Sequence, residues 1–468
     1  MHSFRDAAYI MMNMMIRIIV KNKQHLHPIS GGTEMKNRIG IPLSFMLIAS
    51  VLLAGCGKGE NEAGSKIGED KGVPTISDAP VKIRAALDNA GVDDEFIEIV
   101  QEVLKKKHPN ITLDYIKPGK GTTLKEQIAA GETPDIIISY NGNVASYNEL
   151  DLLYDMTPLI KRYDYNLNRF EPYILEDAKI ASTKDEIFAL PIIVSYHALY
   201  YNKDIFDKFG TPYPTDGMSW QQVIDLAKKV TRTDGGTQYR GLDPGSIIWA
   251  SQPLGIPAID YKTDKATINT DTWKKVFELM KSIYAIPGNE NKSDPRKGFL
   301  TDKTVAMYGN LNIISDLEIA AKDGLNWDVV QYPSYPEKPN TYGNASVNVM
   351  LITKTSKYKE QALQVIETAT SDEVQLASAK QGRVTPLKDP QFKLAFGAGR
   401  DALKGKNVQG IFKSRPVKYP IASKYRSKAE AIVGTKFNQY VAGTVDVNTA
   451  LAQAEEEINK MVEAERGK

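Results

Sequence analysis

Cysteine is nearly absent from this chain, because only Cys56 occurs among its 468 residues. A single cysteine excludes an intramolecular disulfide and makes a poor metal site by itself. The HExxH, GxSxG, GxGxxG and P-loop motifs are missing too, which removes the usual signatures of zinc proteases, serine hydrolases and nucleotide sites. Only two histidines, His108 and His197, follow Cys56, and they lie far apart in the sequence. We therefore expect no catalytic centre of these kinds, no cofactor and no metal.

A strong excess of one charge is also lacking. The chain carries 59 Lys and Arg against 57 Asp and Glu, a net charge of +2. Residues 1–55 hold six of these basic and two of these acidic residues, so the remainder has 53 against 55, a net charge of −2. Nucleic-acid-binding domains are usually clearly basic. The sequence therefore gives no reason to expect a nucleic-acid partner.

A membrane span requires an uninterrupted apolar run of about 20 residues, and no such run precedes Cys56. The segment 39–54 is apolar but is broken by Gly40, Pro42 and two serines, and it follows the basic stretch 35–38. This layout is that of a secretory signal peptide. Its end, Leu53-Ala54-Gly55-Cys56, resembles a bacterial lipobox, in which the cysteine receives lipid and becomes the mature N-terminus. We expect residues 35–55 to be a lipoprotein signal peptide and Cys56 to be lipidated.

The segments on either side of the signal peptide differ from it. Seven of the 13 methionines fall within residues 1–46, and the basic start of a signal peptide is at Met35. We interpret residues 1–34 as an upstream extension from a misplaced start codon. Residues 56–79 are rich in glycine and charge with few apolar residues, which is typical of a flexible tether.

The remaining body of roughly 390 residues is long enough for two domains. Strand-like segments at 81–87, 111–116 and 134–140 alternate with helical patterns at 93–107 and 124–130. Further helical patterns span 219–230, 273–284, 358–370 and 448–464, and 188–202 is rich in strand-forming residues. Alternation of this kind predicts an α/β fold with mainly parallel sheets flanked by helices.

Five blocks in this body resemble bacterial extracellular solute-binding proteins, family 1. They are "LKEQIAAGETPDIIISY", "ALPIIVSYHALYYNKDIFDKFG" with "PTDGMSWQQVIDLAKKV", "TVAMYGN", "NVMLITKTSKYKEQALQVIETATSDEVQ" and "GRVTP". They occur in the family's order over about 80–465. Many sugar-binding members carry a tryptophan after the third block, where this chain reads "LNIISD". The resemblance therefore favours the fold more firmly than the ligand class.

The resemblance implies a fold of two α/β lobes joined by a hinge that the chain crosses several times. We place the first lobe at 80–193 plus 306–345 and the second at 196–305 plus 346–468. It further implies a monomeric receptor, lipid-anchored on the extracytoplasmic face of the cell membrane. Such a receptor captures a small solute, with a saccharide as the leading class, and delivers it to the permease subunits of an ABC importer.

Ligands of open α/β sheets bind outside the carboxyl ends of the strands. Asp88 and Asn89 follow the first strand, and Tyr140 and Asn141 end the third. Trp249 lies in a segment punctuated by Gly and Pro, whereas Trp220 and Trp273 fall on the apolar stripes of helices and Trp327 precedes a strand. At the expected crossings and strand ends we add Tyr196, Tyr308, Asn310 and Asn344. These nine residues, Trp249 included, are the predicted ligand-binding set.

Two alternatives stay open on sequence alone. Carboxylates are plentiful, so the first alternative is a surface lipoprotein enzyme that acts on polysaccharide with a pair of acidic residues. A receptor for a peptide or polyamine would differ only in pocket chemistry. The segment 164–176 has the Asp164, Asn166 and Asn168 spacing of a calcium loop. It lacks the glycine and glutamate that such a loop needs at its sixth and twelfth positions, so a turn rich in Asn and Asp is the simpler interpretation.

Overall fold

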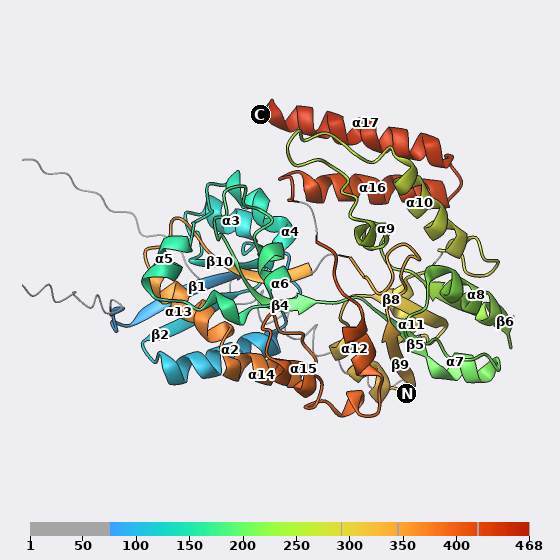
Figure 1. The fold of residues 1–468 in the computed structure, drawn as a ribbon, viewed down its shortest axis with the longest axis horizontal. Coiled ribbons are helices and arrows are strands. Elements are labelled where there is room, and N and C mark those ends of the chain that lie inside the picture. Colours follow the sequence, from blue (N-terminus) through green and yellow to red (C-terminus); the bar gives the residue numbers. More distant parts are fainter. Residues whose placement is uncertain (1–74, 292, 344–345, 419–420, 468) are drawn as a thin grey trace, which may run out of the picture. The chain divides into compact units, whose positions relative to one another are not determined.

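The computed structural model describes residues 75–291, 293–343, 346–418 and 421–467. The predictions for the upstream extension, the signal peptide, Cys56 and nearly all of the tether fall outside these residues. The described chain builds two five-stranded sheets, each flanked by helices (Figure 1). We refer to each sheet with its helices as a lobe, the first lobe being the one that contains the N-terminal strand.

The first sheet has the strand order β2-β1-β3-β10-β4. β1 is parallel to β2 and β3, whereas β10 is antiparallel to both β3 and β4. Its strands are β1 (Val81–Leu87), β2 (Ile111–Ile116), β3 (Ile136–Tyr140), β4 (Leu190–Ser195) and β10 (Ser346–Ile352). Its flanking helices include α2 (Asp94–Lys107), α3 (Leu124–Ala129), α4 (Asn141–Val144), α5 (Thr157–Arg162), α6 (Pro172–Ala178), α13 (Lys359–Ala369), α14 (Asp372–Lys380) and α15 (Pro390–Ala395).

The second sheet has the order β6-β7-β8-β5-β9. Its strands are β5 (Ala198–Asn202), β6 (Arg232–Asp234), β7 (Thr237–Asp243), β8 (Val305–Asn310) and β9 (Trp327–Gln331). Its helices include α7 (Lys203–Lys208), α8 (Trp220–Val230), α9 (Ile247–Ser251), α10 (Asp271–Tyr284), α11 (Pro295–Leu300), α12 (Ile314–Lys322), α16 (Arg426–Val441) and α17 (Val447–Arg466). Only β7 and β8 run parallel in this sheet. Both sheets are therefore mixed, and the prediction of mainly parallel sheets is wrong in this respect.

The predicted elements lie close to the observed ones, because local signals specify their ends. Ser219 caps α8 and forms a capping box with Gln222, as its sequence pattern predicts. Asp93 caps α2, whose first turn is acidic and whose last turn carries three lysines. Trp220, Trp273 and Trp327 are buried in the core of the second lobe. The predicted structural role of these three tryptophans is confirmed.

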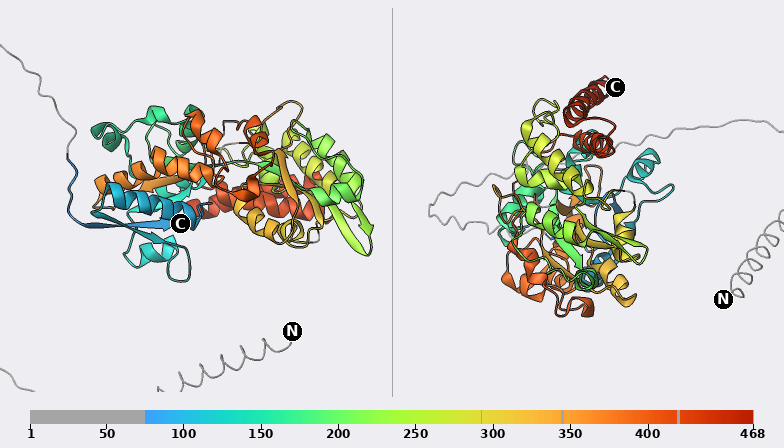
Figure 2. Two further views of the ribbon diagram at one scale, coloured as in Figure 1. Left: turned by 90° about the horizontal axis from the view of Figure 1, so that it is seen from below. Right: turned by 90° about the vertical axis from the view of Figure 1, so that its right-hand side faces the viewer.

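The chain path corrects the predicted lobe boundaries. The sequence places the segment 306–345 in the first lobe. This segment contains all of β9 and all of β8 except its first residue, yet both strands pair with β5 of the second sheet. β10 was assigned to the second lobe but pairs with β3 and β4 of the first, followed by α13 and α14, which pack on α2. Figure 2 shows this orange part of the chain among the blue N-terminal elements. The physical reason is strand pairing, since β10 buries every residue after Ser346 between β3 and β4.

The end of the chain returns to the second lobe. α16 packs against α17 and α9, and α17 also packs against α10. The chain therefore passes between the lobes after β4, before β10 and again between α15 and α16. Within the described residues, none of the helices combines the length and the apolar character needed to cross a lipid bilayer.

Candidate ligand-binding site

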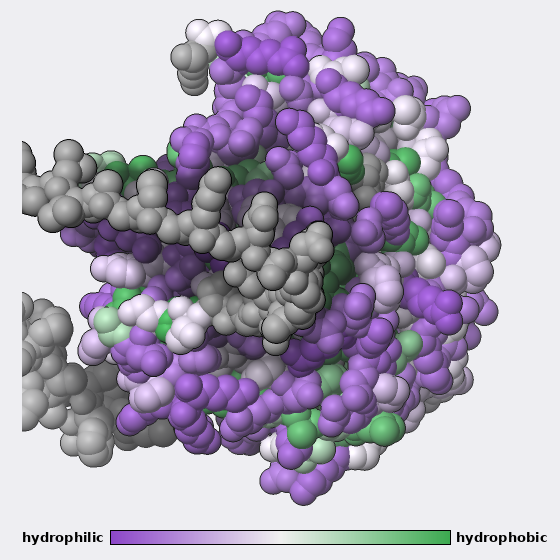
Figure 3. Space-filling model, turned by 60° about the vertical axis from the view of Figure 1, so that its left-hand side comes forward, coloured by the Kyte–Doolittle hydropathy of each residue, from purple (hydrophilic) through white to green (hydrophobic). Residues whose placement is uncertain are grey.

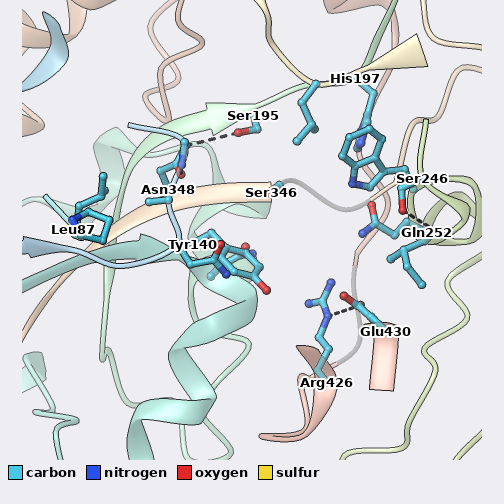
Figure 4. A pocket seen from close by; sticks show the side chains of 18 residues that line it. Leu87, Tyr140, Ser195, His197, Ser246, Gln252, Ser346, Asn348, Arg426 and Glu430 are labelled. Atoms are coloured by element: carbon cyan, nitrogen blue, oxygen red, sulfur yellow. Dashed lines mark hydrogen bonds and ion pairs between the residues drawn. The ribbon is translucent and has the colours of Figure 1, made fainter. Parts of the chain in front are cut away.

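A cavity of about 590 Å³ is lined by residues of both lobes and of the first crossing between them. We call it the Trp249 pocket. Its volume lies within the range of roughly 300–1,000 Å³ that is usual for small-molecule sites. Figure 4 shows Tyr140 and Asn348 on one side of it, Ser246 and Gln252 on the other, and Arg426 with Glu430 between them.

The first-lobe wall is formed where β3 ends beside β10. Tyr140 and Asn348 are paired in the sheet register, so their side chains lie next to each other. The Asn348 Oδ1 accepts a hydrogen bond of 2.9 Å from the Gly91 amide, and its Nδ2 lies 3.5 Å from Ser195 Oγ. Asn141, directly after Tyr140, is buried and hydrogen-bonds the Asp177 carbonyl and the Val347 amide. Asn141 therefore holds the strand ends in place as well as lining the pocket.

The second-lobe wall is formed by the short helix α9. Ser246 caps it by accepting a hydrogen bond from the Ile248 amide. Trp249 projects from this helix and is half-buried. Gly245, with φ +77°, permits this arrangement, because a Cβ there would lie 2.9 Å from Trp249 ring atoms and 2.5 Å from the Gly309 carbonyl oxygen. The loop and helix are thus shaped to hold one aromatic ring at the pocket wall.

The crossing after β4 contributes Ser195 and His197. The His197 ring lies 5.3 Å from the Trp249 ring and is flanked by Tyr332 and Tyr342. Burial lowers the pKa of His197 to about 3, so its imidazole is neutral at physiological pH. Among the described residues, neither of its ring nitrogens has a hydrogen-bond partner, and the same holds for the buried Gln252 Oε1. Buried polar atoms are nearly always hydrogen-bonded in native proteins, so these two side chains are suited to bind a ligand.

The charged groups of the pocket wall are paired. Arg426 Nε donates a hydrogen bond of 2.7 Å to Glu430 Oε1, one turn further along α16. Both side chains are largely buried. The remaining polar lining is uncharged, and it includes Asn89, Ser195, Ser246, Gln252 and Asn348. The pocket therefore presents the aromatic rings of Trp249 and Tyr140 and neutral hydrogen-bonding groups rather than a net charge.

The predicted residues divide into three groups. Asn89, Tyr140, Asn141 and Trp249 line the Trp249 pocket, whereas Asp88, Tyr196, Tyr308 and Asn310 do not, and Asn344 falls outside the described residues. Asp88 instead accepts a 2.6 Å hydrogen bond from the Tyr147 hydroxyl. Tyr308 packs beside Phe299, and burial raises its pKa to about 12. Asn310 accepts a hydrogen bond from the amide of Leu311, and Leu311 lines the pocket.

Tyr196 lies at the first crossing, as predicted, but its side chain leaves the pocket. Its hydroxyl donates a 3.1 Å hydrogen bond to Asn312 Oδ1, and its ring packs against Phe396. Successive side chains of an extended segment point to opposite sides, so Ser195 and His197 face the pocket while Tyr196 faces away. The same alternation, read from the sequence, could have indicated that His197 faces the pocket. No local signal indicates Asn348, Gln252 or Arg426, which long-range folding brings to the site.

The first part of the calcium-like segment 164–176 folds into a turn, and α6 begins within the segment at Pro172. Asn166 Oδ1 accepts a 3.0 Å hydrogen bond from the Asn168 amide, as in an Asx turn. No group of three or more His, Cys, Asp or Glu side chains suited to a metal ion occurs within the described ranges. Figure 3 shows one face of the molecule, on which hydrophilic residues dominate and hydrophobic residues occur singly or in small groups.

Comparisons with known proteins bear on the family and the fold of the chain. The chain is 25% identical over 196 residues to the multiple sugar-binding protein of Streptococcus mutans, covering 41% of each chain. The matched region spans about two fifths of the length of such curated relatives. An ABC substrate-binding protein from Listeria monocytogenes in complex with cycloalternan has a similar structure, with TM-score 0.67 and 19% identity over 82% of this chain and 99% of that one.

The sugar-binding protein MalE of Xanthomonas citri is similar as well, with TM-score 0.63 and 17% identity over 82% of this chain and 98% of that one. At such identities the structures support the two-lobe fold alone. The family model described as bacterial extracellular solute-binding protein matches residues 98–391, which is more than half of the chain. The chain therefore belongs to the bacterial extracellular solute-binding protein family.

Proposed function

We propose that the protein is the saccharide receptor of an ABC importer, anchored by lipid at Cys56 outside the cytoplasmic membrane. The observation that carries this proposal is the lining of the Trp249 pocket, which combines the aromatic rings of Trp249 and Tyr140 with neutral hydrogen-bonding groups. Aromatic side chains pair a large apolar face with well-defined geometry, which suits the apolar face of a sugar ring. Amide, hydroxyl and imidazole groups suit its hydroxyls. Relatives and structural neighbours named for sugars support the same class.

The proposed mechanism is capture without chemistry. A saccharide that contacts both lobes shifts the equilibrium between their arrangements toward the one that it binds more tightly. Permease subunits would then recognise that arrangement, and the protein would act as a monomer. We propose no catalytic residue, because the neutral His197 is buried among aromatic rings and the carboxylate of the pocket, Glu430, is paired with Arg426.

A ligand screen tests the saccharide class. Thermal unfolding is measured with mono-, di- and trisaccharides of glucose, mannose and N-acetylglucosamine, with peptides and polyamines as the comparison. A ligand at 100 times its dissociation constant adds about 2.7 kcal/mol to the free energy of unfolding. Stabilisation by a saccharide is the expected result. Stabilisation only by a peptide or polyamine, or conversion of the bound saccharide to a product, would contradict the proposal.

The lipid anchor has its own test. In the native host, replacing Cys56 with serine should release the protein from the membrane fraction and leave saccharide affinity unchanged, because the cysteine precedes the described body. Acylated protein persisting in the Cys56→Ser strain would refute lipidation at this residue.

A tryptophan fluorescence experiment tests the location of the site. Trp220, Trp273 and Trp327 are buried in the core, whereas Trp249 is half-buried and lines the pocket. A saccharide that changes the intrinsic fluorescence should therefore act through Trp249. We expect Trp249→Phe to abolish the fluorescence change while calorimetry still detects binding, and the matched variant Trp220→Phe to retain it. A change that survives in Trp249→Phe would place the ligand elsewhere.

A further inference from the structure

A second cavity, of about 530 Å³, is lined by residues of both lobes, and we call it the Tyr342 cavity. Tyr196 lines it, whereas its neighbours Ser195 and His197 line the Trp249 pocket (Figure 4). Because successive side chains of an extended segment point to opposite sides, the Tyr342 cavity lies behind the first crossing, on the far side from the Trp249 pocket. Among the described residues, the two linings have none in common. The volume of this cavity is also usual for a small-molecule site.

The walls of the Tyr342 cavity are largely aromatic and aliphatic. Tyr173 of α6 contributes from the first lobe, and Ile411 and Phe412 contribute from the short helix η5 (Val408–Lys413). Tyr342 comes from the segment between β9 and β10 and belongs to the core of the second lobe. Tyr173 is 45% exposed, so the cavity is open to solvent at this residue. Such walls suit the apolar body of a small ligand.

Arg415 supplies an unpaired positive charge to this lining. The described lining holds two cations, Lys393 and Arg415, and one carboxylate, Glu171. Lys393 pairs with Glu171 at 3.1 Å, whereas the Arg415 side chain has no ion-pair partner in the described part of the chain. The backbone of Arg415 is fixed, because its amide donates to the Asn340 carbonyl at 2.8 Å and its carbonyl accepts from the Tyr342 amide at 3.3 Å. A guanidinium binds a carboxylate through two parallel hydrogen bonds, so the cavity favours an anion and disfavours a cation.

The Tyr342 cavity and the Trp249 pocket share a thin wall. The ring of Tyr342 lies 5.6 Å from the ring of His197, which lines the Trp249 pocket. The next residue, Gly343, packs on Gln252 of that pocket so closely that a Cβ at Gly343 would lie 2.8 Å from the Gln252 Cβ. A ligand that holds Tyr342 in this position therefore also supports His197 and Gln252 in the wall of the Trp249 pocket.

We propose that the Tyr342 cavity is a second binding site, for a small carboxylate with an aromatic or branched apolar body, and that its occupation strengthens binding in the Trp249 pocket. The carboxylate pairs with Arg415, and the apolar body contacts Tyr342 and Phe412. Both cavities are lined by residues of both lobes, so a ligand in either one stabilises the arrangement that the other requires. The second site is independent of the proposed function, whereas its coupling to a saccharide rests on that function.

Calorimetric titration without saccharide tests the second site. The probes are benzoate, phenylacetate, indoleacetate and isocaproate, each beside its uncharged amide. We expect at least one acid to bind with a dissociation constant of about 1 mM or lower. Its amide should bind about tenfold more weakly or worse, because a hydrogen bond to a charged group is lost. If none of the acids binds at this level, or if the amide binds as tightly as its acid, the carboxylate site is refuted.

Three variants localise the acid. Arg415→Gln should lower the affinity for the acid to that for its amide. The matched control is Lys418→Gln, which removes an exposed cation that does not line the Tyr342 cavity, and it should leave the affinity unchanged. Tyr173→Ala should weaken acid and amide alike, because it removes an aromatic wall and no charge. All three side chains are exposed, so we expect the melting temperatures to stay close to that of the wild type. An Arg415→Gln variant that binds the acid as tightly as the wild type does would overturn the assignment to Arg415.

Titration of a saccharide with and without saturating acid tests the coupling. For a saccharide found in the ligand screen, we expect the dissociation constant to fall about fivefold or more when the acid is bound, and the saccharide should tighten binding of the acid by the same factor. Arg415→Gln should remove this effect and leave the saccharide affinity without acid unchanged. If the acid binds but the saccharide affinity stays constant or falls, the coupling alone is refuted. If the acid binds and no saccharide does, the proposed function fails and the second site stands.

Discussion

Replacing Trp249 with alanine should weaken binding of the recognised saccharide by about 2 kcal/mol or more, which is about 30-fold in the dissociation constant. Large aromatic side chains held in well-packed positions dominate binding energy at interfaces. Trp249 has this character, because its ring lies against His197, and its backbone is fixed by the Ser246 cap and the tight turn at Gly245. The ring is therefore oriented before the ligand arrives, so little conformational entropy is lost on binding.

Calorimetry of Trp249→Ala beside Trp249→Phe measures this effect. Phenylalanine keeps a smaller ring and should recover part of the affinity. The matched control is Ile248→Ala, which shortens a neighbouring half-buried residue that lines the same pocket but provides no aromatic face. We expect its affinity to fall less than that of Trp249→Ala. An affinity of Trp249→Ala within about threefold of the wild type, a difference of about 0.7 kcal/mol, would exclude Trp249 from the site.

The sequence predicts the individual elements well because their signals are local. Ser219 with Gln222 specifies the start of α8, and the acidic start and basic end of α2 follow the helix dipole. The assignment of strands to lobes failed because pairing is not a local property. The apolar run in β10 indicates a buried strand, but the same pattern would fit the centre of either sheet. Only its pairing with β3 and β4 shows that β10 belongs to the first sheet.

The candidate site shows the same division between local and long-range information. Tyr140 and Asn89 could be predicted because strand ends in an α/β sheet face a common edge. Trp249 could be selected because the other three tryptophans lie in core elements. Tyr308 has the same local appearance as Tyr140, yet it packs against Phe299. Arg426 comes from a helix near the C-terminus, and no spacing in the sequence indicates that it lines the same pocket as Tyr140.

Acid should destabilise the protein through His197, and this is the second large effect that the structure predicts. Burial lowers the pKa of His197 to about 3 in the folded state, whereas an exposed histidine in the unfolded chain has a pKa of about 6.5. Between these values the unfolded state binds a proton that the folded state does not. The free energy of unfolding therefore falls with decreasing pH, by about 1.4 kcal/mol per pH unit, and the loss ends near pH 3.

The variant His197→Phe should remove this dependence. Phenylalanine can occupy the space between Trp249, Tyr332 and Tyr342, and it brings no unpaired ring nitrogen. We expect the free energy of unfolding of the variant to exceed that of the wild type by an amount that grows as pH falls. The growth between pH 7 and pH 5 should be about 2 kcal/mol. Urea denaturation at a series of pH values measures the free energy of unfolding of both proteins. In the difference between the variant and the wild type, the contributions of the other titrating groups cancel.

His108 provides the matched control. Burial also lowers its pKa, but this histidine caps α2 and is only partly buried. Solvent screens the interactions of such a group, so His108→Gln should change the pH dependence of stability less than His197→Phe does. Parallel pH profiles of the wild type and His197→Phe would mean that His197 has the same pKa in the folded and the unfolded state. In that case burial does not lower the pKa of His197, and the inference that the imidazole in the pocket stays neutral in acid would be wrong.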